Sequence, residues 1–284
     1  MSTQKIAGVV VLYEPTNSDL DNIQTYINDI DILYVIDNSK NNNQDRIIKN
    51  NKIKYIFNNA NIGVSSALNI AAKNAIEDGY KWLLTMDQDT QFKTDTMPAM
   101  KKAIEENDTE NIGIITPWHD TKLKIKKPEE EIDYPLEVMT SGNLVNLDIY
   151  SKIGGFKDWL FIDGIDIEYG LNLRKNGYKI MRLNYISIDH NLGDIEYKNF
   201  LWEKDIYCSN HNYIRKYYMA RNYLYIKDMY LDTNKEYVKK LGNQKRNILI
   251  ILLFEKDKYR KIRNIFRGYR DYKKGIKGKY RYKN

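Results

Sequence analysis

Two aspartates, Asp87 and Asp89, stand one residue apart at the end of the mostly apolar stretch WLLTMDQDT (residues 82–90). Carboxylates this close repel each other unless a cation lies between them. Mg²⁺ or Mn²⁺ is commonly held by one or two carboxylates together with the phosphates of a substrate. The alternative is an ordinary turn in which Asp89 or Thr90 caps the following helix. The spacing therefore indicates a metal–phosphate site and leaves the turn open.

A second group of carboxylates lies in FIDGIDIEYG (residues 161–170), where Asp163, Asp166 and Glu168 occur within six residues. A positioned carboxylate can remove the proton from an attacking hydroxyl group. The same residues could form a solvated helix face. Apolar residues between the carboxylates weaken that alternative, because they predict a partly buried segment: Phe161, Ile162, Ile165 and Ile167.

The elements that must position these groups alternate between strands and helices. Apolar runs typical of buried strands occur at 6–14, 32–39, 53–59, 82–87 and 112–117. Helical patterns lie between them, which predicts an α/β domain with a mostly parallel central sheet flanked by helices. Ligands of such sheets bind beyond the carboxyl ends of the strands. Polar clusters follow four of the strands and should face one crevice: Tyr13-Glu14, Asp37-Asn38-Ser39, Asn58-Asn59 and Asp87-Gln88-Asp89.

The composition of the 284 residues, with 42% hydrophobic and 29% charged residues, is typical of a globular protein. The single cysteine, Cys208, excludes an internal disulfide and favours a reducing compartment. The N-terminal segment has no signal-peptide cleavage site, and the longest later apolar run, 248–254, is too short to span a bilayer. We therefore expect a cytoplasmic protein, either free in solution or attached to the inner face of the cell membrane.

The basic charge is concentrated in the C-terminal part. Residues 235–284 hold 18 Lys/Arg against 4 Asp/Glu, whereas the rest of the chain holds 27 against 34. We expect a catalytic domain at 1–230 and a basic helical extension at 231–284. A mildly acidic body with a basic tail does not fit a general nucleic-acid binder, and the chain has no nucleic-acid recognition motif.

The tail carries an amphipathic pattern. Apolar residues recur at helical spacing in Tyr259, Ile262, Phe266 and Tyr269, with Lys and Arg between them. This pattern is typical of a helix that lies on an anionic membrane surface. A solvated tail is the alternative.

The ordered motifs of the chain resemble those of family-2 inverting glycosyltransferases with the glycosyltransferase-A, or nucleotide-diphosphosugar transferase, fold. The resemblance runs from about Ile6 to Arg221. Its motifs are VVVLYEP, VIDNS, NNANIGVSSALNIAAKNA, MDQD, SGNLVNLDIYSKIGGF, WLFIDGIDIEYGLNLRKNGYKI and DHNLGD. The last three are most similar to the bacterial rhamnosyltransferase branch.

The resemblance implies a metal-dependent enzyme of cell-surface polysaccharide synthesis. It would move a sugar, with rhamnose favoured, from dTDP-rhamnose or a UDP-sugar to a hydroxyl of a saccharide or lipid-linked acceptor. A nucleotidyltransferase is one alternative, but YEPTNSD after the first strand is not a Gly-rich basic phosphate loop. An inactive nucleotide-sugar-binding module is another, and the full carboxylate set argues against it.

The resemblance also implies roles for individual residues. The nucleotide-sugar would be bound by Leu12, Tyr13, Glu14, Asp37, Asn61, Gly63 and Asp87. Asp37 would accept a hydrogen bond from the pyrimidine, and Gly63 would let backbone amides approach an anion at the start of a helix. The divalent ion, Mg²⁺ or Mn²⁺, would be held by Asp87, Asp89 and His190.

On the acceptor side, the resemblance implies that Asp166 is the general base, with Asp163 and Glu168 as neighbours that support the loop or contact the acceptor. Further residues expected at the site are Ser141, Gly142, Trp159 and Arg221. Trp159 could stack on a sugar face or pack in the core. Arg221 could meet the diphosphate or form a structural ion pair. One departure from the family pattern is Asn172, where an arginine is usual.

Overall fold

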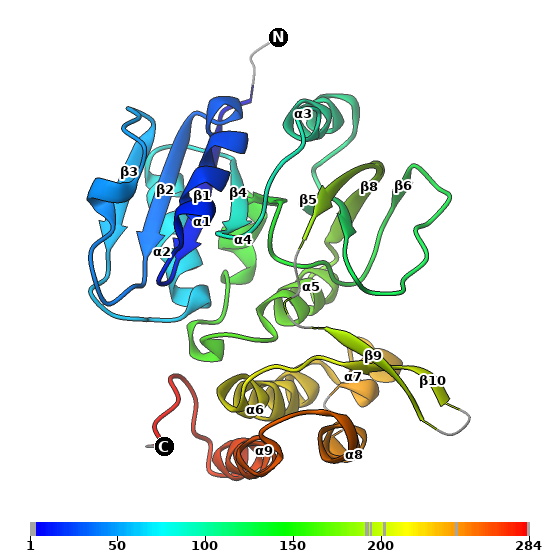
Figure 1. Ribbon diagram of the computed structural model, residues 1–284. Coiled ribbons are helices and arrows are strands. Elements are labelled where there is room, and N and C mark those ends of the chain that lie inside the picture. Colours follow the sequence, from blue (N-terminus) through cyan, green and yellow to red (C-terminus); the bar gives the residue numbers. More distant parts are fainter. Residues whose placement is uncertain (1–3, 191–192, 194, 201–202, 242–243, 283–284) are drawn as a thin grey trace. The chain divides into compact units, whose positions relative to one another are not determined.

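The computed structural model describes residues 4–282 except 191–192, 194, 201–202 and 242–243. Contacts divide the chain into two compact units (Figure 1). The first unit comprises Met1–Asp158 and Asp166–Asn191, and the second comprises Trp159–Ile165 and Leu192–Asn284. This division differs from the expected boundary at residue 230, because the helix that precedes residue 230 packs on the C-terminal helix.

The first unit is built on a mixed sheet of eight strands within the described residues, in the order β3-β2-β1-β4-β7-β5-β8-β6. The strands are β1 (Ile6–Leu12), β2 (Ile32–Asp37), β3 (Ile53–Phe57), β4 (Trp82–Asp87), β5 (Ile112–Asp120), β6 (Ile132–Asp133), β7 (Asn143–Asn146) and β8 (Lys179–Asp189). The pairs β1–β2, β1–β4, β2–β3 and β5–β8 are parallel. The predicted α/β class with a mostly parallel sheet is confirmed.

Strand direction decides where the polar strand ends meet. β7 runs antiparallel to both of its neighbours, β4 and β5. β5 and β8 therefore run in the same direction as β1 to β4, and the carboxyl ends of all these strands lie along one edge of the sheet. The register places Val11 opposite Asp87 and Leu12 opposite Asp37.

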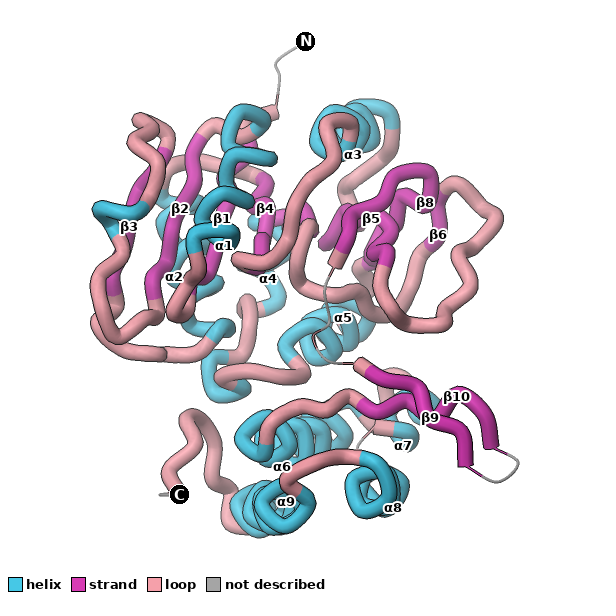
Figure 2. The backbone as a smooth tube through the Cα atoms, in the orientation of Figure 1, coloured by secondary structure: helices cyan, strands magenta, loops and turns pink. Residues whose placement is uncertain are grey.

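Helices cover both faces of this sheet (Figures 1 and 2). They are α1 (Asn17–Asp21), α2 (Val64–Glu77), α3 (Thr96–Glu106), α4 (Leu147–Ile153) and α5 (Ile165–Lys175), with short 3-10 turns at Asn22–Thr25, Ile27–Asp29, Gln44–Arg46 and Asp158–Leu160. Alternate residues of β1 and β4 pack with apolar residues of α1, its following turns and α3 in one buried cluster. α2 contacts β1, β2 and β4 on the other face. The sheet is thus buried on both sides, as its continuous apolar strands require.

β5 extends three residues beyond its expected end at Pro117. The pairing with β8 shifts register between Pro117 and Trp118, where the partner changes from Leu183 to Ser187. Proline cannot donate a ladder hydrogen bond and is tolerated at such irregularities. The strand therefore resumes after the shift and brings His119 and Asp120 to the same edge as Asp87.

The second unit contains a hairpin of β9 (Glu196–Phe200) and β10 (Glu203–Cys208), followed by helices. The helices are α6 (Tyr213–Tyr230), α7 (Lys235–Lys240), α8 (Gln244–Phe254) and α9 (Lys258–Lys273). α6 and α9 lie close together because α9 has a glycine at the contact: a Cβ atom at Gly268 would lie 2.6 Å from the backbone oxygen of Tyr217. No helix in the described ranges has the length and apolar character needed to cross a membrane.

Candidate active site

The end of β1 is hydrogen-bonded to the segments that follow its two neighbouring strands, β4 and β2. The backbone N–H of Tyr13 donates to Gln88 after β4, and that of Glu14, at φ 48°, donates to Ser39 after β2. Tyr13 and Glu14 are exposed at this edge, and their contact with a nucleotide stays a prediction. Leu12 differs from its predicted role: its side chain is fully buried in the core cluster, because its face of β1 points toward the α1 side.

Asp37 at the end of β2 is also fully buried. Its carboxylate accepts hydrogen bonds from the backbone of Ser39 (2.8 Å), the side chain of Asn43 (2.9 Å) and the hydroxyl of Tyr55 (2.5 Å). Burial would raise the pKa of Asp37, but these hydrogen bonds outweigh it and hold the pKa below its ordinary value. In this structure Asp37 organises the strand end, and its contact with a pyrimidine stays a prediction.

Gly63 begins α2 with φ 91°, a conformation that favours glycine. Its N–H donates to the side chain of Asn61, and its carbonyl accepts from Asn38 after β2. The start of α2 is therefore attached to the sheet edge, and the partial positive charge of a helix N-terminus faces the strand ends.

The predicted metal residues come together from β4 and the end of β8. A carboxylate oxygen of Asp87, one of Asp89 and a ring nitrogen of His190 all lie within 4.8 Å of one another. Ligand atoms on one octahedral Mg²⁺ lie roughly 3 to 4 Å apart, so small side-chain movements would bring all three onto one ion. Oxygen and imidazole ligands suit Mn²⁺ as well. The residues present fit a divalent cation.

The surroundings of this cluster support that assignment. Neighbouring atoms desolvate the carboxylate of Asp89, which raises its pKa although the residue as a whole is exposed. A positive charge on His190 lowers the pKa of Asp89 by a smaller amount. The hydroxyl of Thr90 lies 3.1 Å from Nδ1 of His190. With Nδ1–H donating to Thr90, Nε2 keeps its lone pair for a metal, which is the usual arrangement around a metal-bound histidine.

The buried residue Ser141 links Asp87 to Thr90. Its Oγ accepts the backbone N–H of Asp87 (2.9 Å) and donates to Thr90 (2.8 Å). Ser141 is buried, and the N–H of the adjacent Gly142 donates to Thr85 on β4. We expected these two residues beside the acceptor. In the structure Ser141 holds Asp87 and Thr90 in place, and a position beside the acceptor stays a prediction for both residues.

Asp166 lines a pocket of about 320 Å³ together with residues of β5, β8 and the intervening loops. A second pocket of about 490 Å³ is lined by Asp89 and His190. The two pockets share Asp120 and Thr121 in their walls. A carboxylate and a candidate metal site therefore face adjoining cavities in the first unit.

The other two carboxylates of FIDGIDIEYG have different surroundings. Asp163, at φ 63°, is paired with Arg215 of α6, with an Nη2–Oδ1 distance of 2.5 Å, and its side chain is only 5% exposed. Glu168 is fully buried. Of the three, Asp166 alone lines a pocket described here. These contacts favour a loop-supporting role for Asp163, and the burial of Glu168 does not favour a contact with an acceptor.

Comparison with known proteins decides the family. The sequence model described as "Glycosyl transferase family 2" matches residues 16–165, more than half of the chain. The chain belongs to glycosyl transferase family 2. The dTDP-rhamnosyl transferase RfbF of Shigella flexneri is 25% identical over 237 residues, which cover 76% of this chain and 78% of that protein. The predicted relation of this family-2 glycosyltransferase to the rhamnosyltransferase branch is confirmed.

Solved structures show the same fold. GalNAc-T7, crystallised with UDP, GalNAc and Mn²⁺, superposes with a TM-score of 0.62 at 15% identity. The match covers 84% of this chain but 50% of that one, so the family-2 chain spans half the length of that protein. Residues 1–349 of S. aureus TarS in complex with UDP-GlcNAc give a TM-score of 0.56 at 12% identity, with 99% and 94% coverage. The predicted glycosyltransferase-A fold is confirmed.

Two further residues expected at the family-2 site occupy the second unit. Arg221 of α6 is fully buried, and its guanidinium donates to the carbonyl groups of Trp159 and Gly278 and to the side chain of Asn222. Trp159 packs edge-on against Tyr225, with the ammonium of Lys277 4.5 Å from its ring centre. These contacts attach the C-terminal segment and favour the structural alternatives for Arg221 and Trp159 over a diphosphate contact and sugar stacking.

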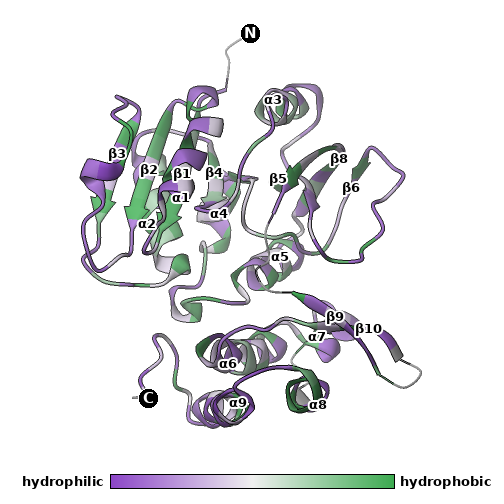
Figure 3. Ribbon diagram, in the orientation of Figure 1, coloured by the Kyte–Doolittle hydropathy of each residue, from purple (hydrophilic) through white to green (hydrophobic). Residues whose placement is uncertain are grey.

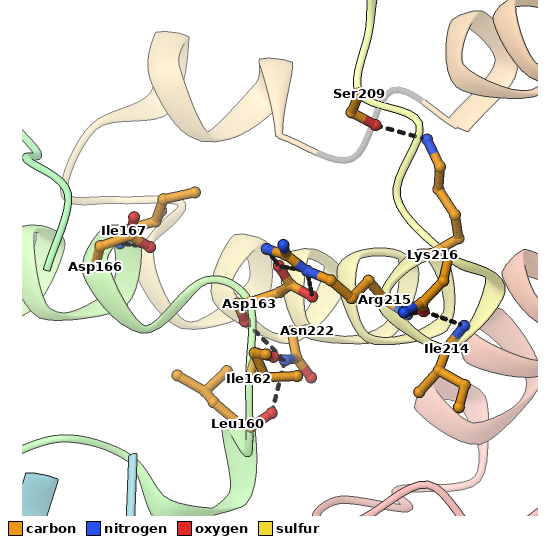
Figure 4. A network of polar contacts seen from close by, with 11 residues as sticks. Leu160, Ile162, Asp163, Asp166, Ile167, Ser209, Ile214, Arg215, Lys216 and Asn222 are labelled. Atoms are coloured by element: carbon orange, nitrogen blue, oxygen red, sulfur yellow. Dashed lines mark hydrogen bonds and ion pairs between the residues drawn. The ribbon is translucent and has the colours of Figure 1, made fainter. Parts of the chain in front are cut away.

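The loop before Asp166 is held from the same helix. The amide of Asn222 lies 2.8–2.9 Å from the carbonyl oxygens of Leu160, Ile162 and Asp163 (Figure 4). Phe161 and Asp163 both have positive φ values, 67° and 63°, which are unfavourable for non-glycine residues. Asn222 and Arg215 thus hold the loop in a conformation that the loop sequence alone would not favour.

Sequence reasoning missed a set of residues at the end of β5. His119, Asp120 and the β8 residue Arg182 line the pocket that contains Asp166. Arg182 makes two hydrogen bonds to Asp133 and lies 4.8 Å from the ring of Trp118. The sequence does carry a signal, because WHD follows TP at the end of an apolar run, but the proline at 117 predicts the end of the strand.

Lowering the pH is expected to destabilise the first unit through His119. Nε2 of His119 donates to the carbonyl of Ser141 at 2.6 Å, and burial lowers the pKa of His119 from 6.5 to about 4. The unfolded chain binds this proton near pH 6.5 and the folded chain only near pH 4. Stability should therefore fall as the pH drops between these values, by on the order of 3 kcal/mol.

Urea unfolding across this pH range measures the effect. His119→Gln keeps a donor for the Ser141 carbonyl and cannot be protonated, so its unfolding free energy should lose less on acidification than that of the natural chain. An equal pH slope in both proteins would show that His119 is not the titrating group.

Proposed function

We propose that this family-2 glycosyltransferase is a metal-dependent, inverting enzyme that transfers rhamnose from dTDP-rhamnose to a hydroxyl group of a saccharide or lipid-linked acceptor. One observation carries the proposal: Asp166 and the Asp89–His190 cluster line two pockets with a common wall at Asp120 and Thr121. An acceptor hydroxyl and a donor diphosphate placed in these pockets would meet at that wall.

The residues of the two pockets have different roles in the proposed reaction. Asp166 is the base that takes the proton of the acceptor hydroxyl as its oxygen attacks the anomeric carbon. The attack displaces the nucleoside diphosphate in one step and inverts the anomeric configuration. Asp87, Asp89 and His190 are the residues that would hold Mg²⁺ or Mn²⁺, and the ion would supply positive charge against a diphosphate.

Tyr13, Glu14, Asn61 and the start of α2 at Gly63 lie at or beside the ends of β1 to β3 and are the residues we assign to the nucleotide. The sugar assignment is supported by the relative RfbF, a dTDP-rhamnosyl transferase. UDP-sugars are the second choice, supported by the UDP and UDP-GlcNAc complexes of the structural relatives. We place the reaction in cell-surface polysaccharide synthesis at the cytoplasmic side of the membrane.

Metal-dependent binding of the donor is the expected result of a thermal-shift experiment. A ligand that binds only the folded state at about 100 times its Kd adds about 2.7 kcal/mol of stability, which raises the Tm by several degrees. The chain should respond to dTDP-rhamnose with Mn²⁺ or Mg²⁺ and much less to either alone.

Two variants make this test specific. Asp89→Ala should lose the metal-dependent response, because it removes a proposed ligand. Asp108→Ala is the matched control, since Asp108 is an exposed carboxylate before the amino end of β5, at the opposite edge of the sheet. A response to UDP-sugars alone would replace the rhamnose assignment. The absence of any response to nucleotide-sugars would contradict the proposed function.

A further inference from the structure

Helices α8 and α9 expose an unusual number of large apolar side chains. Of the fourteen such side chains that are exposed in the described residues, six lie on these two helices. We call them the α8–α9 face: Leu249, Leu252, Leu253, Tyr259, Phe266 and Tyr269. Tyr259 is 74% exposed and Phe266 is 61% exposed. Figure 3 shows the strongly apolar character of α8.

The α8–α9 face points away from the core of its own unit. Ile251 of α8 and Ile265 of α9 pack with Ala220 of α6 in one buried cluster. At about 100° per residue, Leu249 and Leu253 lie on the side of α8 opposite Ile251, and Leu252 lies on its flank. The same geometry places Phe266 and Tyr269 away from the buried side of α9. Solvent-facing sides of helices are normally polar, so this face lacks a function within the fold.

The charges around this face have one sign. Among residues 245–274, all of which the structure describes, a single carboxylate, Asp257, is exposed. The exposed cations in the same range are Lys245, Arg246, Lys256, Lys258, Arg260, Arg263, Arg270, Lys273 and Lys274. The other carboxylates of the range, Glu255 and Asp271, are buried. Asp257 and Asp271 each lie 3.9 Å from an arginine, Arg260 and Arg270. The exposed cations still outnumber the exposed carboxylates, so the charge around the apolar and aromatic side chains is positive overall.

We propose that the α8–α9 face docks on the surface of an anionic lipid bilayer. Leucine side chains enter the acyl boundary, tyrosine and phenylalanine lie at the headgroup level, and the flanking cations contact lipid phosphates. A second copy of the chain is a poor occupant, because it would place like charges against each other. A nucleic acid would leave the three leucines without an apolar partner. This inference does not depend on the donor or on the metal.

Co-sedimentation of the intact chain with vesicles tests the proposal. The chain should sediment with vesicles that contain phosphatidylglycerol, bind phosphatidylcholine vesicles far less, and dissociate as salt is added. Removing one cation by Arg263→Gln should weaken the partition coefficient about fivefold. Phe266→Ser should weaken it roughly tenfold, because an apolar ring no longer enters the bilayer.

Matched variants exclude a general effect of surface substitution. Tyr269 and Tyr185 are 48% and 49% exposed, but Tyr185 lies on β8 of the first unit. Tyr269→Ser should weaken vesicle binding and Tyr185→Ser should not, with circular dichroism showing both to be folded. Equal binding to neutral and anionic vesicles, or no binding at low salt, would overturn the proposal. So would a dimer that Leu252→Ser dissociates, or salt-sensitive binding to RNA in place of vesicles. If the chain does not bind vesicles but still shows the thermal shift with the donor, the docking proposal is wrong and the proposed transferase function is unaffected.

Discussion

Replacing Asp166 by asparagine is expected to lower turnover by about 10²–10⁴-fold, the usual contribution of a general base. Asparagine keeps the size and the polar contacts of the side chain but cannot take a proton from the acceptor. Asp166 lines a pocket apart from the Asp89–His190 cluster, so donor binding should be largely retained. The change should therefore fall on kcat, with little effect on the donor KM.

Transfer to acceptor and donor binding should be measured on the same protein preparation. Asp163→Asn is the informative comparison, because Asp163 is paired with Arg215 and lines neither of the two pockets. It should lower the stability of the protein, and any loss of activity should appear together with that loss. If Asp166→Asn retains near-normal turnover, the base is a different group and the pocket assignment is wrong.

The second large effect is expected at Glu255, which lies at the centre of a buried charge cluster in the second unit. Its two carboxylate oxygens accept from the ammonium groups of Lys216 (3.0 Å) and Lys261 (2.8 Å), and all three residues are buried. Burial lowers the pKa of Lys216, and the charge of Glu255 acts in the opposite direction. Glu255→Gln leaves two buried cations without a counter-charge and should cost about 3–5 kcal/mol.

Urea unfolding followed by circular dichroism measures this cost. The double variant Glu255→Gln with Lys261→Met removes one of the two stranded charges, while Lys216 keeps its hydrogen bond to Ser209. It should recover a large part of the loss. A cost below about 1 kcal/mol for the single variant would be typical of an exposed ion pair and would contradict the burial of this cluster.

The sheet and the position of its polar edge could be predicted from the sequence. Continuous apolar runs mark strands that are buried on both faces, and the parallel-sheet rule brings Asp87 and the polar residues after β1 and β2 to one edge without knowledge of any contact. The proximity of His190 to Asp87 and Asp89 came from the resemblance to the family.

Features that depend on tertiary packing could not be predicted in the same way. The face of β1 that carries Leu12 is decided by α1, and the burial of Asp37 is decided by Asn43 and Tyr55 from the next loop and strand. Arg221 resembles a ligand for diphosphate because arginine commonly has that role, yet its partners in the structure include two backbone carbonyls far away in sequence. Side-chain type narrows the possible roles, and long-range contacts choose among them.

The attachment of Gly278 has a consequence for inheritance. Its N–H donates to Trp159, and its carbonyl accepts from the buried guanidinium of Arg221. A chain that breaks off shortly before residue 278 loses none of the residues that line the two pockets. It would nevertheless leave a buried cation without one of its acceptors, which is costly. Natural variation that removes Gly278 should therefore be constrained by folding.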